Sequence, residues 1–240
     1  MSKKVNIKRM AESFGVNAIL ADQLRPEIIY RVHNVTNLTG SAFILRFDRN
    51  GLEFAPGQHI TLGLPGDNQL REYSVYSPAN VDYLEVLVKE VESGSVSRKL
   101  KNLQPGDIIK VDGPFGFFVP DKTKLFSAKH LFIATGTGIA PFHSIALSYK
   151  DFDFTILHGI RYANEQYGKA DYPPERYISC VSREEGGNFH GRVTDYLLKN
   201  SAGSDTLVYL CGNYEMIHAV YDVLVTNGLS PDNIRTEVYF

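Results

Sequence analysis

Residues Leu131-Phe132-Ile133-Ala134-Thr135-Gly136-Thr137-Gly138-Ile139-Ala140-Pro141 join a continuous apolar run to a glycine loop and the start of a predicted helix. Continuous rather than alternating hydrophobicity is typical of a strand buried on both faces of a parallel sheet. Glycines at such a junction let backbone amides approach a pyrophosphate at the helix N-terminus. Because Pro141 replaces the third glycine of the usual Gly-x-Gly-x-x-Gly fingerprint, a plain tight turn is an equal alternative.

The same pattern of apolar runs and helices continues to the end of the chain. Further runs cover residues 154–160, 177–181, 207–211 and 234–240, and helices are predicted over 139–149, 193–199 and 214–225. The last helix should end at Asn227-Gly228, a good C-terminal cap. Residues 125–240 are therefore predicted to form a five-stranded, parallel, doubly wound α/β domain.

Upstream of residue 124 the hydrophobic pattern has a period of two. Short alternating segments occur at 30–33, 43–48, 59–64, 73–77, 84–91 and 107–111, separated by glycine- and proline-containing turns. This pattern predicts an antiparallel six-stranded β-barrel over residues 27–124, interrupted by one short helix at 96–103. Residues 1–26 are predicted to be an N-terminal arm, in which a short amphipathic helix would end at Pro26.

The composition is that of a globular protein. The chain has 240 residues, 43% of them apolar, and a formal net charge of −2, which gives no whole-chain electrostatic argument for binding nucleic acid. Its two cysteines can neither hold an iron–sulfur cluster alone nor form a secreted disulfide framework. No apolar run approaches membrane-spanning length. We expect a soluble protein of a reducing compartment, the cytoplasm.

Arg71-Glu72-Tyr73-Ser74 combines a cation, an aromatic ring and a hydroxyl along a predicted strand. Alternation places Arg71 and Tyr73 on one face, where a guanidinium can hold a phosphate and a phenol ring can lie along a flat heterocycle. We interpret the ligand as a flavin, and Glu72 as solvent-facing. Gly94-Ser95-Val96-Ser97 opens the barrel helix and offers either a serine cap or a second phosphate-binding loop.

Three arginines of the α/β domain lie beyond the predicted strand ends, where ligands of open α/β sheets bind. They are Arg161, Arg183 and Arg192, and Arg161 follows the second strand, where a NAD-selective site usually carries an acid. Guanidinium groups suit a 2′-phosphate through forked, charge-assisted hydrogen bonds, which favours NADP over NAD. The alternative is surface pairing with nearby acids, namely Glu165, Glu184 and Glu185.

Two further stretches end apolar runs. Cys211-Gly212-Asn213 closes the fourth run, and a buried structural cysteine is the common interpretation of such a thiol. The sequence finishes with Thr236-Glu237-Val238-Tyr239-Phe240. Two terminal aromatic residues indicate either a segment placed for use in a site or a hydrophobic contact between domains.

Taken together, these residues resemble the ferredoxin–NADP⁺ reductase family, and most closely its bacterial-type members. The matching stretches occur in family order over residues 27–240: Arg71-Glu72-Tyr73-Ser74, Gly94-Ser95-Val96-Ser97, Thr135 to Pro141, Cys211-Gly212-Asn213 and Glu237-Val238-Tyr239-Phe240. The resemblance implies an FAD-binding barrel followed by an NADP-binding domain.

For FAD, the resemblance implies that Arg71 holds the pyrophosphate, Tyr73 the flavin ring region and Ser74 a position near flavin N5. Backbone at Val88 and Lys89 would meet the isoalloxazine edge. The flavin phosphates would lie against the residues of the helix-opening loop, Gly94, Ser95, Val96 and Ser97.

For NADP, the resemblance implies that Thr137 touches the pyrophosphate or the nicotinamide side. Arg183 and Arg192 match the family's 2′-phosphate arginines, with Arg161 as a third, and Cys211 would approach the nicotinamide ring.

The terminal residues complete the implied site. Glu237 joins Ser74 and Cys211 around the reacting atoms, and Tyr239 would shield the flavin face. Phe240 would pack on the FAD adenine, where bacterial-type members often have tryptophan.

The implied activity is reversible hydride transfer between NADPH and FAD, coupled to single-electron transfer to ferredoxin or flavodoxin. Two alternatives on the same scaffold are an NADPH-dependent free-flavin or cytochrome b5-type reductase, and an electron-relay subunit of a larger oxidoreductase.

Overall fold

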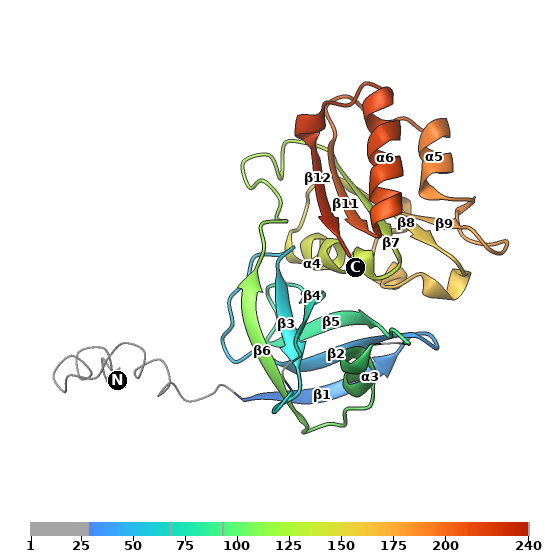
Figure 1. The fold of residues 1–240 in the computed structure, drawn as a ribbon. Helices are drawn as coiled ribbons and strands as arrows, with labels where there is room; N and C mark the ends of the chain where they lie inside the picture. Colours follow the sequence, from blue (N-terminus) through green and yellow to red (C-terminus); the bar gives the residue numbers. More distant parts are fainter. Residues whose placement is uncertain (1–28, 68, 93, 240) are drawn as a thin grey trace.

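A computed structural model describes residues 29–67, 69–92 and 94–239 of the chain, in two lobes (Figure 1). The first lobe is an antiparallel barrel, and the second is a parallel sheet covered by helices. The predicted N-terminal arm with its helix and the terminal Phe240 lie outside the described residues. The predicted domain boundary at residue 124 falls between the last barrel strand and the first strand of the second lobe.

The barrel lobe contains a six-stranded antiparallel sheet, as predicted. Its strands are β1 (Tyr30–Asn37), β2 (Ala42–Asp48), β3 (His59–Gly63), β4 (Arg71–Ser74), β5 (Tyr83–Lys89) and β6 (Ile108–Phe115), in the order β4-β3-β6-β1-β2-β5. An antiparallel bridge between Val75 and Val86 connects the two ends of this order. The helix α3 (Ser95–Lys101) follows β5.

Alternation along the barrel strands separates a core face from an outer face. Phe43, Leu45 and Phe47 of β2 are fully buried in the barrel core, with Val86 and Val88 of the neighbouring β5. Between these two valines, Leu87 belongs to a different apolar cluster, which continues into the second lobe. The side chain of Val88 therefore faces the core, and any ligand contact at this residue has to come from its backbone.

The second sheet has five main parallel strands and one short addition. The main strands are β7 (His130–Thr135), β8 (Phe154–Ile160), β9 (Tyr177–Val181), β11 (Leu207–Gly212) and β12 (Ile234–Val238), and the order is β10-β9-β8-β7-β11-β12. The two-residue β10 (Phe189–His190) makes the sheet six-stranded rather than five-stranded. Such a short segment carries no hydrophobic period, and it is held beside β9 by Asn188, whose side chain accepts from the Ser179 amide at 3.0 Å.

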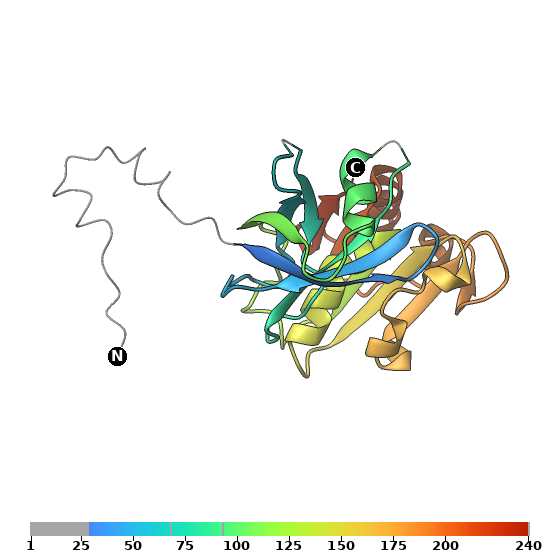
Figure 2. The ribbon, with the colours of Figure 1, turned by 90° about the horizontal axis from the view of Figure 1, so that it is seen from below.

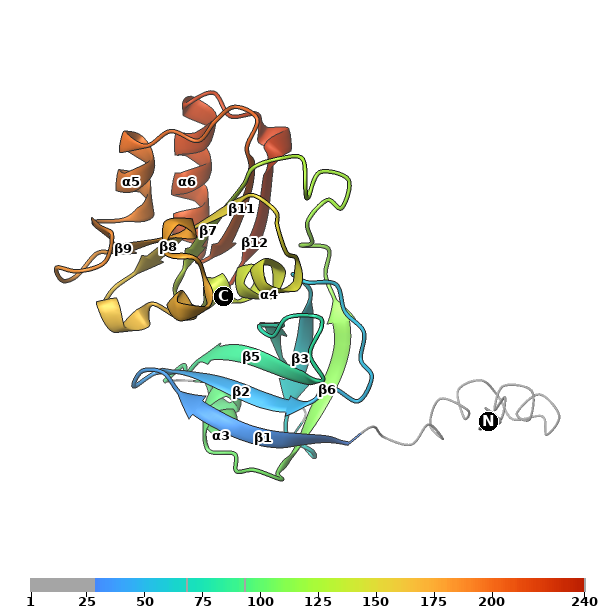
Figure 3. The same ribbon diagram turned by 180° about the vertical axis from the view of Figure 1, so that it is seen from behind.

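Helices cover both faces of this sheet, as expected of a doubly wound fold (Figures 1 and 3). Phe132 and Ala134 of β7 pack towards α4 (Ala140–Ser148), whereas Ile133 packs with α5 (Val193–Lys199) and α6 (Tyr214–Thr226). Helix α6 ends at Asn227, followed by Gly228 with φ of 89°. Short 3-10 turns occur at Gly136–Ile139, Ala163–Glu165, Lys169–Asp171, Pro174–Arg176 and Pro231–Asn233.

In the described part of the chain, no helix has the length and apolar character required to cross a membrane.

Helix α4 joins the two lobes. Ser144 Oγ donates to the Ser77 carbonyl at 2.8 Å, and the Ala79 amide donates to Ser148 Oγ at 2.7 Å. The His143 ring stacks on Tyr76 with 3.7 Å between ring centroids. Seen from below (Figure 2), the barrel lies in front of the α/β lobe.

Substituting Gly138 tests how tightly the two loops at the edge of the sheet pack. A Cβ on Gly138 would lie 2.4 Å from the Cys211 carbonyl oxygen, so the backbone has to shift. We expect Gly138→Ala to lower the free energy of unfolding by about 2 kcal/mol, the usual cost of overpacking. The measurement is urea unfolding followed by circular dichroism. Gly40→Ala is the control, because a Cβ there meets nothing within 4 Å; equal stability of both variants would contradict the packing argument.

Candidate active site

A cavity of about 1100 Å³ lies between the two lobes. Its barrel side comes from β4, the end of β5 and the start of α3, and its α/β side comes from residues at the carboxyl ends of β7, β8, β9, β11 and β12. The strand order reverses between β7 and β11, and ligands of open α/β sheets bind outside the strand ends at this point. This volume slightly exceeds the roughly 300–1000 Å³ usual for ligand pockets.

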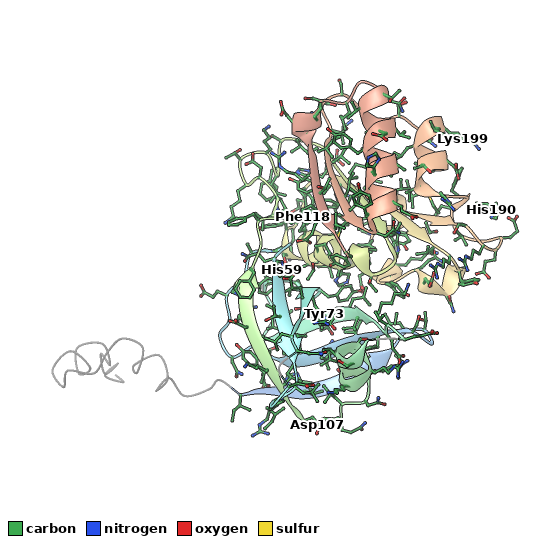
Figure 4. All side chains as sticks on the ribbon, in the orientation of Figure 1. His59, Tyr73, Asp107, Phe118, His190 and Lys199 are labelled. Atoms are coloured by element: carbon green, nitrogen blue, oxygen red, sulfur yellow. The ribbon has the colours of Figure 1, made fainter. Side chains whose placement is uncertain are left out.

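The predicted stretch Arg71-Glu72-Tyr73-Ser74 forms β4 and lines the cavity along its whole length. Arg71 is exposed, and Tyr73 packs against the barrel core. Burial raises the pKa of Tyr73 to about 12, so its phenol stays neutral. Figure 4 shows Tyr73 and His59 at the end of the barrel facing the α/β lobe, whereas Asp107 lies at the opposite end. The exposed Lys89 also lines the cavity.

The loop that opens α3 lines the same cavity with Gly94, Ser95, Val96 and Ser97. The prediction that Ser95 or Ser97 caps the helix is wrong, because Gly94 is the N-cap residue and no side chain caps it. Ser95 Oγ instead donates to Gln69 Oε1 at 2.6 Å, and Ser97 Oγ accepts from the Val91 amide at 3.1 Å. Both serines thus stabilise the loop rather than the first helical turn.

Two glycine loops meet at the switch point of the α/β sheet. Thr135 Oγ1 accepts from the Asn213 amide at 3.3 Å, which ties the loop after β7 to the loop after β11. A Cβ on Gly212 would lie 2.2 Å from this hydroxyl, so only glycine fits between the loops. Gly136, with φ of 53°, has open space beside it and lines the cavity with Thr137.

Ser74 is the point where the terminal segment reaches the barrel. The Tyr239 hydroxyl donates to Ser74 Oγ at 2.6 Å, and Ser74 Oγ lies 3.4 Å from Glu237 Oε2. The Tyr239 amide donates to the Gly212 carbonyl at 2.8 Å, which continues the pairing of β12 with β11. The structure therefore brings together three residues that are distant in sequence and that were all predicted for the site.

His59 belongs to the same cluster and was missed by the sequence analysis. It pairs with Ser74 in the register of β3 and β4, and its Nδ1 lies 3.8 Å from Glu237 Oε1. The ring is 19% exposed and is covered on one side by Phe115, 6.0 Å away between ring centroids. The only signal in the sequence was its place at the start of an alternating strand, which does not indicate a neighbour almost 180 residues later.

Glu237 is an acid in an unfavourable place for a charge. Burial raises the pKa of its carboxyl to about 7, and the negative charge of Glu72 acts in the same direction, while the hydrogen bond from Ser74 opposes the shift. Glu72, predicted to face solvent, is exposed and lines the cavity mouth. A carboxyl that titrates near neutral pH is suited to accept and return a proton.

Cys211 lies beneath the cavity surface rather than on it. Its side chain is fully buried, and the neighbouring Gly212 and Asn213 form the lining. Burial raises the pKa of the Cys211 thiol well above its ordinary value, and the nearby Glu237 adds to the rise. The thiol is therefore neutral at neutral pH, and a buried neutral thiol is a poor nucleophile.

The three predicted arginines converge on the far end of the cavity. Arg161, Arg183 and Arg192 all line it and are exposed. Their guanidinium groups form no ion pair with any described residue. Of the acids considered as surface partners, two accept backbone hydrogen bonds: Glu165 accepts from the Arg161 amide at 2.8 Å, and Glu184 accepts from the Ala163 amide at 2.6 Å. The third, Glu185, is exposed and lies 3.9 Å from His190.

The cavity therefore fits two nucleotide-like ligands. The barrel side offers a cation, an aromatic ring and a serine-containing loop, and the α/β side offers a glycine loop at a switch point and three exposed guanidinium groups. Glycine at 136 leaves open space where a side chain would obstruct a phosphate. Ser74 and Glu237 lie where the two halves meet. Such a fold and site define a two-domain oxidoreductase that uses a flavin and a nicotinamide dinucleotide.

Comparison with known proteins agrees with this class. The oxidoreductase FAD-binding domain family matches residues 30–119, and the oxidoreductase NAD-binding domain family matches residues 132–222. The chain is 30% identical over 235 residues to ferredoxin–NADP reductase of Azotobacter vinelandii, covering 84% of this chain and 90% of that protein. The chain belongs to the ferredoxin–NADP reductase family, with FAD and a nicotinamide dinucleotide as its cofactors.

Related reductases match as well. NADH-cytochrome b5 reductase 1 of Lodderomyces elongisporus is 32% identical over 243 residues, covering 89% of this chain and 78% of that protein. The chain spans 66% of a toluate 1,2-dioxygenase electron transfer component from Pseudomonas putida. A ferredoxin NADP⁺ reductase from Neisseria gonorrhoeae, crystallised with bound FAD and NADP, has the same fold, with a TM-score of 0.80, 24% identity, and coverage of 90% of this chain and all of that chain.

The shifted acid gives a pH-dependent stability. The pKa of Glu237 rises from 4.5 to about 7 on folding, so the fold favours its protonated form. The contribution of protonated Glu237 to the free energy of unfolding is fully present below its unfolded pKa of 4.5, and it is lost as the pH rises through the folded pKa of about 7. Glu237→Gln should therefore gain stability over wild type as the pH rises from about 5 to about 8, reaching on the order of 3–4 kcal/mol for a shift of about 2.5 pKa units at about 1.4 kcal/mol per unit.

Urea unfolding across this pH range measures the gain, and Glu92→Gln at an exposed position is the control. A difference between Glu237→Gln and wild type that stays constant with pH would show that the carboxyl does not titrate near 7.

Proposed function

We propose that this protein is an FAD-dependent reductase that takes hydride from NADPH and passes electrons one at a time to ferredoxin or flavodoxin. The observation that carries the proposal is a cavity with a serine–tyrosine–glutamate cluster where the two lobes meet and, on its α/β side, three arginines that form no ion pair with any residue that the structure describes. The related ferredoxin–NADP reductases support the choice of acceptor.

On the barrel side, Arg71 would hold the FAD pyrophosphate, and Tyr73 would lie along the flavin ring. Ser74 would face flavin N5, and the loop from Gly94 to Ser97 would carry the phosphates. The backbone of Val88 and Lys89 would meet the ring edge. Arg71, Tyr73, Ser74, Lys89 and the loop from Gly94 to Ser97 all line the cavity, which supports this assignment.

Bound FAD supplies the chemistry that converts a hydride from NADPH into single electrons. The protein's own residues position the reactants and handle the proton. Ser74 is held in place by the Tyr239 hydroxyl and directed towards Glu237. Glu237 holds or releases a proton near neutral pH, because burial raises its pKa to about 7.

Tyr239 would also control access to the reacting atoms. It is tied at one end to Ser74 and at the other to the Gly212 carbonyl. A nicotinamide ring has to displace its side chain from the Ser74 side of the cavity, which makes entry a gated step. Cys211, beneath Gly212, would support the nicotinamide side as a neutral group.

A second candidate function is that of a cytochrome b5-type or free-flavin reductase. It is favoured by the 32% identity to NADH-cytochrome b5 reductase 1, which is similar to the identity to ferredoxin–NADP reductases. The three exposed arginines that line the cavity favour NADPH over NADH as the hydride donor. Steady-state assays with ferredoxin, flavodoxin, cytochrome b5 and free flavin rank the acceptors directly.

Arg183→Ala tests the cofactor preference. Loss of one charge-assisted hydrogen bond to the 2′-phosphate should raise the KM for NADPH roughly 10- to 100-fold and leave the KM for NADH within about twofold. Arg192→Ala should act in the same direction. The control is Arg235→Ala, whose guanidinium donates to the Asp232 carbonyl outside the cavity. An unchanged ratio of NADPH to NADH efficiency in Arg183→Ala would overturn the NADP assignment.

Ser74→Ala tests the cluster at the junction. The change removes the acceptor of the Tyr239 hydroxyl and the donor to Glu237. We expect the purified variant to stay yellow, and stopped-flow bleaching of the flavin absorption by NADPH to slow at least about tenfold, at about 1.4 kcal/mol per factor of ten. Ser77→Ala, three residues further along the chain and outside the cavity, should not slow this phase. Equal bleaching rates in wild type and Ser74→Ala would contradict the role of Ser74.

A further inference from the structure

His158 is a fully buried histidine of β8 that uses both ring nitrogens. Its Nε2 lies 2.8 Å from the Gly136 carbonyl oxygen, and its Nδ1 lies 2.8 Å from the Tyr177 hydroxyl. Neither His158 nor Tyr177 lines the cavity, but Gly136 and Thr137 do. The pair thus contacts the loop that begins at Gly136 from the side opposite the cavity.

The partners fix the protonation of the ring. A carbonyl can only accept, so the hydrogen sits on Nε2 and is donated to Gly136. Nδ1 then carries the lone pair and accepts the Tyr177 hydroxyl hydrogen. Burial lowers the pKa of His158 to about 4, which keeps the ring neutral at neutral pH. Every polar atom of the pair is thereby satisfied inside a dry part of the fold.

This hydrogen bond sets the direction of the next backbone amide. In a trans peptide the C=O and N–H bonds point in opposite directions, so turning the Gly136 carbonyl towards His158 turns the Thr137 amide away from it. The side away from the buried His158 is the side on which Gly136 and Thr137 line the cavity. A carbonyl oxygen on that side would repel an anion, whereas an amide attracts one.

Gly136 begins the 3-10 turn Gly136–Ile139 that leads into α4. Its φ of 53° lies in the left-handed region that glycine enters freely. The His158 ring is the side chain that bonds the Gly136 carbonyl, and this bond acts together with the turn to fix the direction of the Gly136–Thr137 peptide.

We propose that His158, supported by Tyr177, is a positioning residue that presets the Gly136–Thr137 peptide for the pyrophosphate of the nicotinamide dinucleotide. The proposal rests on the proposed use of this cavity by NADP(H). Loss of the His158 ring should weaken the binding of ligands that carry the pyrophosphate and of no others, because the arginines that would hold the 2′-phosphate belong to other loops.

The test compares two probes on the flavin-loaded protein by isothermal titration calorimetry. The first, 2′-phospho-ADP-ribose, carries the pyrophosphate, and the second, 2′-AMP, does not. His158→Leu should weaken binding of 2′-phospho-ADP-ribose roughly 5- to 10-fold, the effect of one lost hydrogen bond, and leave 2′-AMP within about twofold. His158→Gln, which keeps a donor at a similar reach, should restore most of the lost affinity.

Tyr177→Phe serves as a second variant if His158→Leu does not fold. It removes only the hydroxyl, and it should shift the two probes in the same selective way but less strongly. Equal weakening of both probes, or no weakening of either, would overturn the positioning role. Unmodified ADP-ribose is titrated as well: if wild type binds it as tightly as 2′-phospho-ADP-ribose, the NADP preference is wrong, while the comparison of His158→Leu with wild type still decides the role of His158.

Discussion

The docking of α4 on the segment that follows β4 is the interaction on which the site depends. His143 donates from Nδ1 to the Tyr76 carbonyl at 2.8 Å, and Ser144 and Ser148 bond the backbone of Ser77 and Ala79. Backbone groups buried between two lobes have to find such partners, so the contact has a defined register rather than a sliding surface. Ser74 lies two residues before this segment, and the Gly136 loop leads directly into α4. One interface thereby fixes the flavin-side wall and the nucleotide loop relative to each other.

The cluster around Ser74 shows what the interface makes possible. Glu237 and Tyr239 arrive from the last strand, and His59 arrives from β3. Burying the Glu237 carboxyl disfavours its charge, and a single hydrogen bond from Ser74 only partly offsets this cost. The consequence is an acid that is partly protonated near neutral pH. A fully solvated glutamate would be ionised there and could accept a proton only weakly.

The sequence predicted those features that repeat along the chain, and missed those that depend on a single contact. Continuous apolar runs identified the five main strands of the second sheet, because both faces of that sheet are covered by helices. The two-residue β10 is too short to show a hydrophobic period, and the hydrogen bond from the Ser179 amide to Asn188 holds it beside β9. His59 lies in the site because β3 pairs with β4, and Cys211 lies beneath Gly212 where two loops pack closely. Neither fact can be read from residue types, since each depends on which strand becomes the neighbour.

The two ends of the cavity are built on different principles, which separates cofactor preference from chemistry. The three arginines are exposed, come from separate loops and have no ionic partner among the described residues, so each can change without leaving a buried group unsatisfied. Ser74, Glu237 and Tyr239 share hydrogen bonds, so a change in one alters the others. The effect of substituting an arginine should add to the effect of substituting a residue of the distant cluster. The effects of two substitutions within the cluster should not add. Under the proposed function, the choice between NADPH and NADH depends on the arginine end, and it can change while the reacting end stays the same.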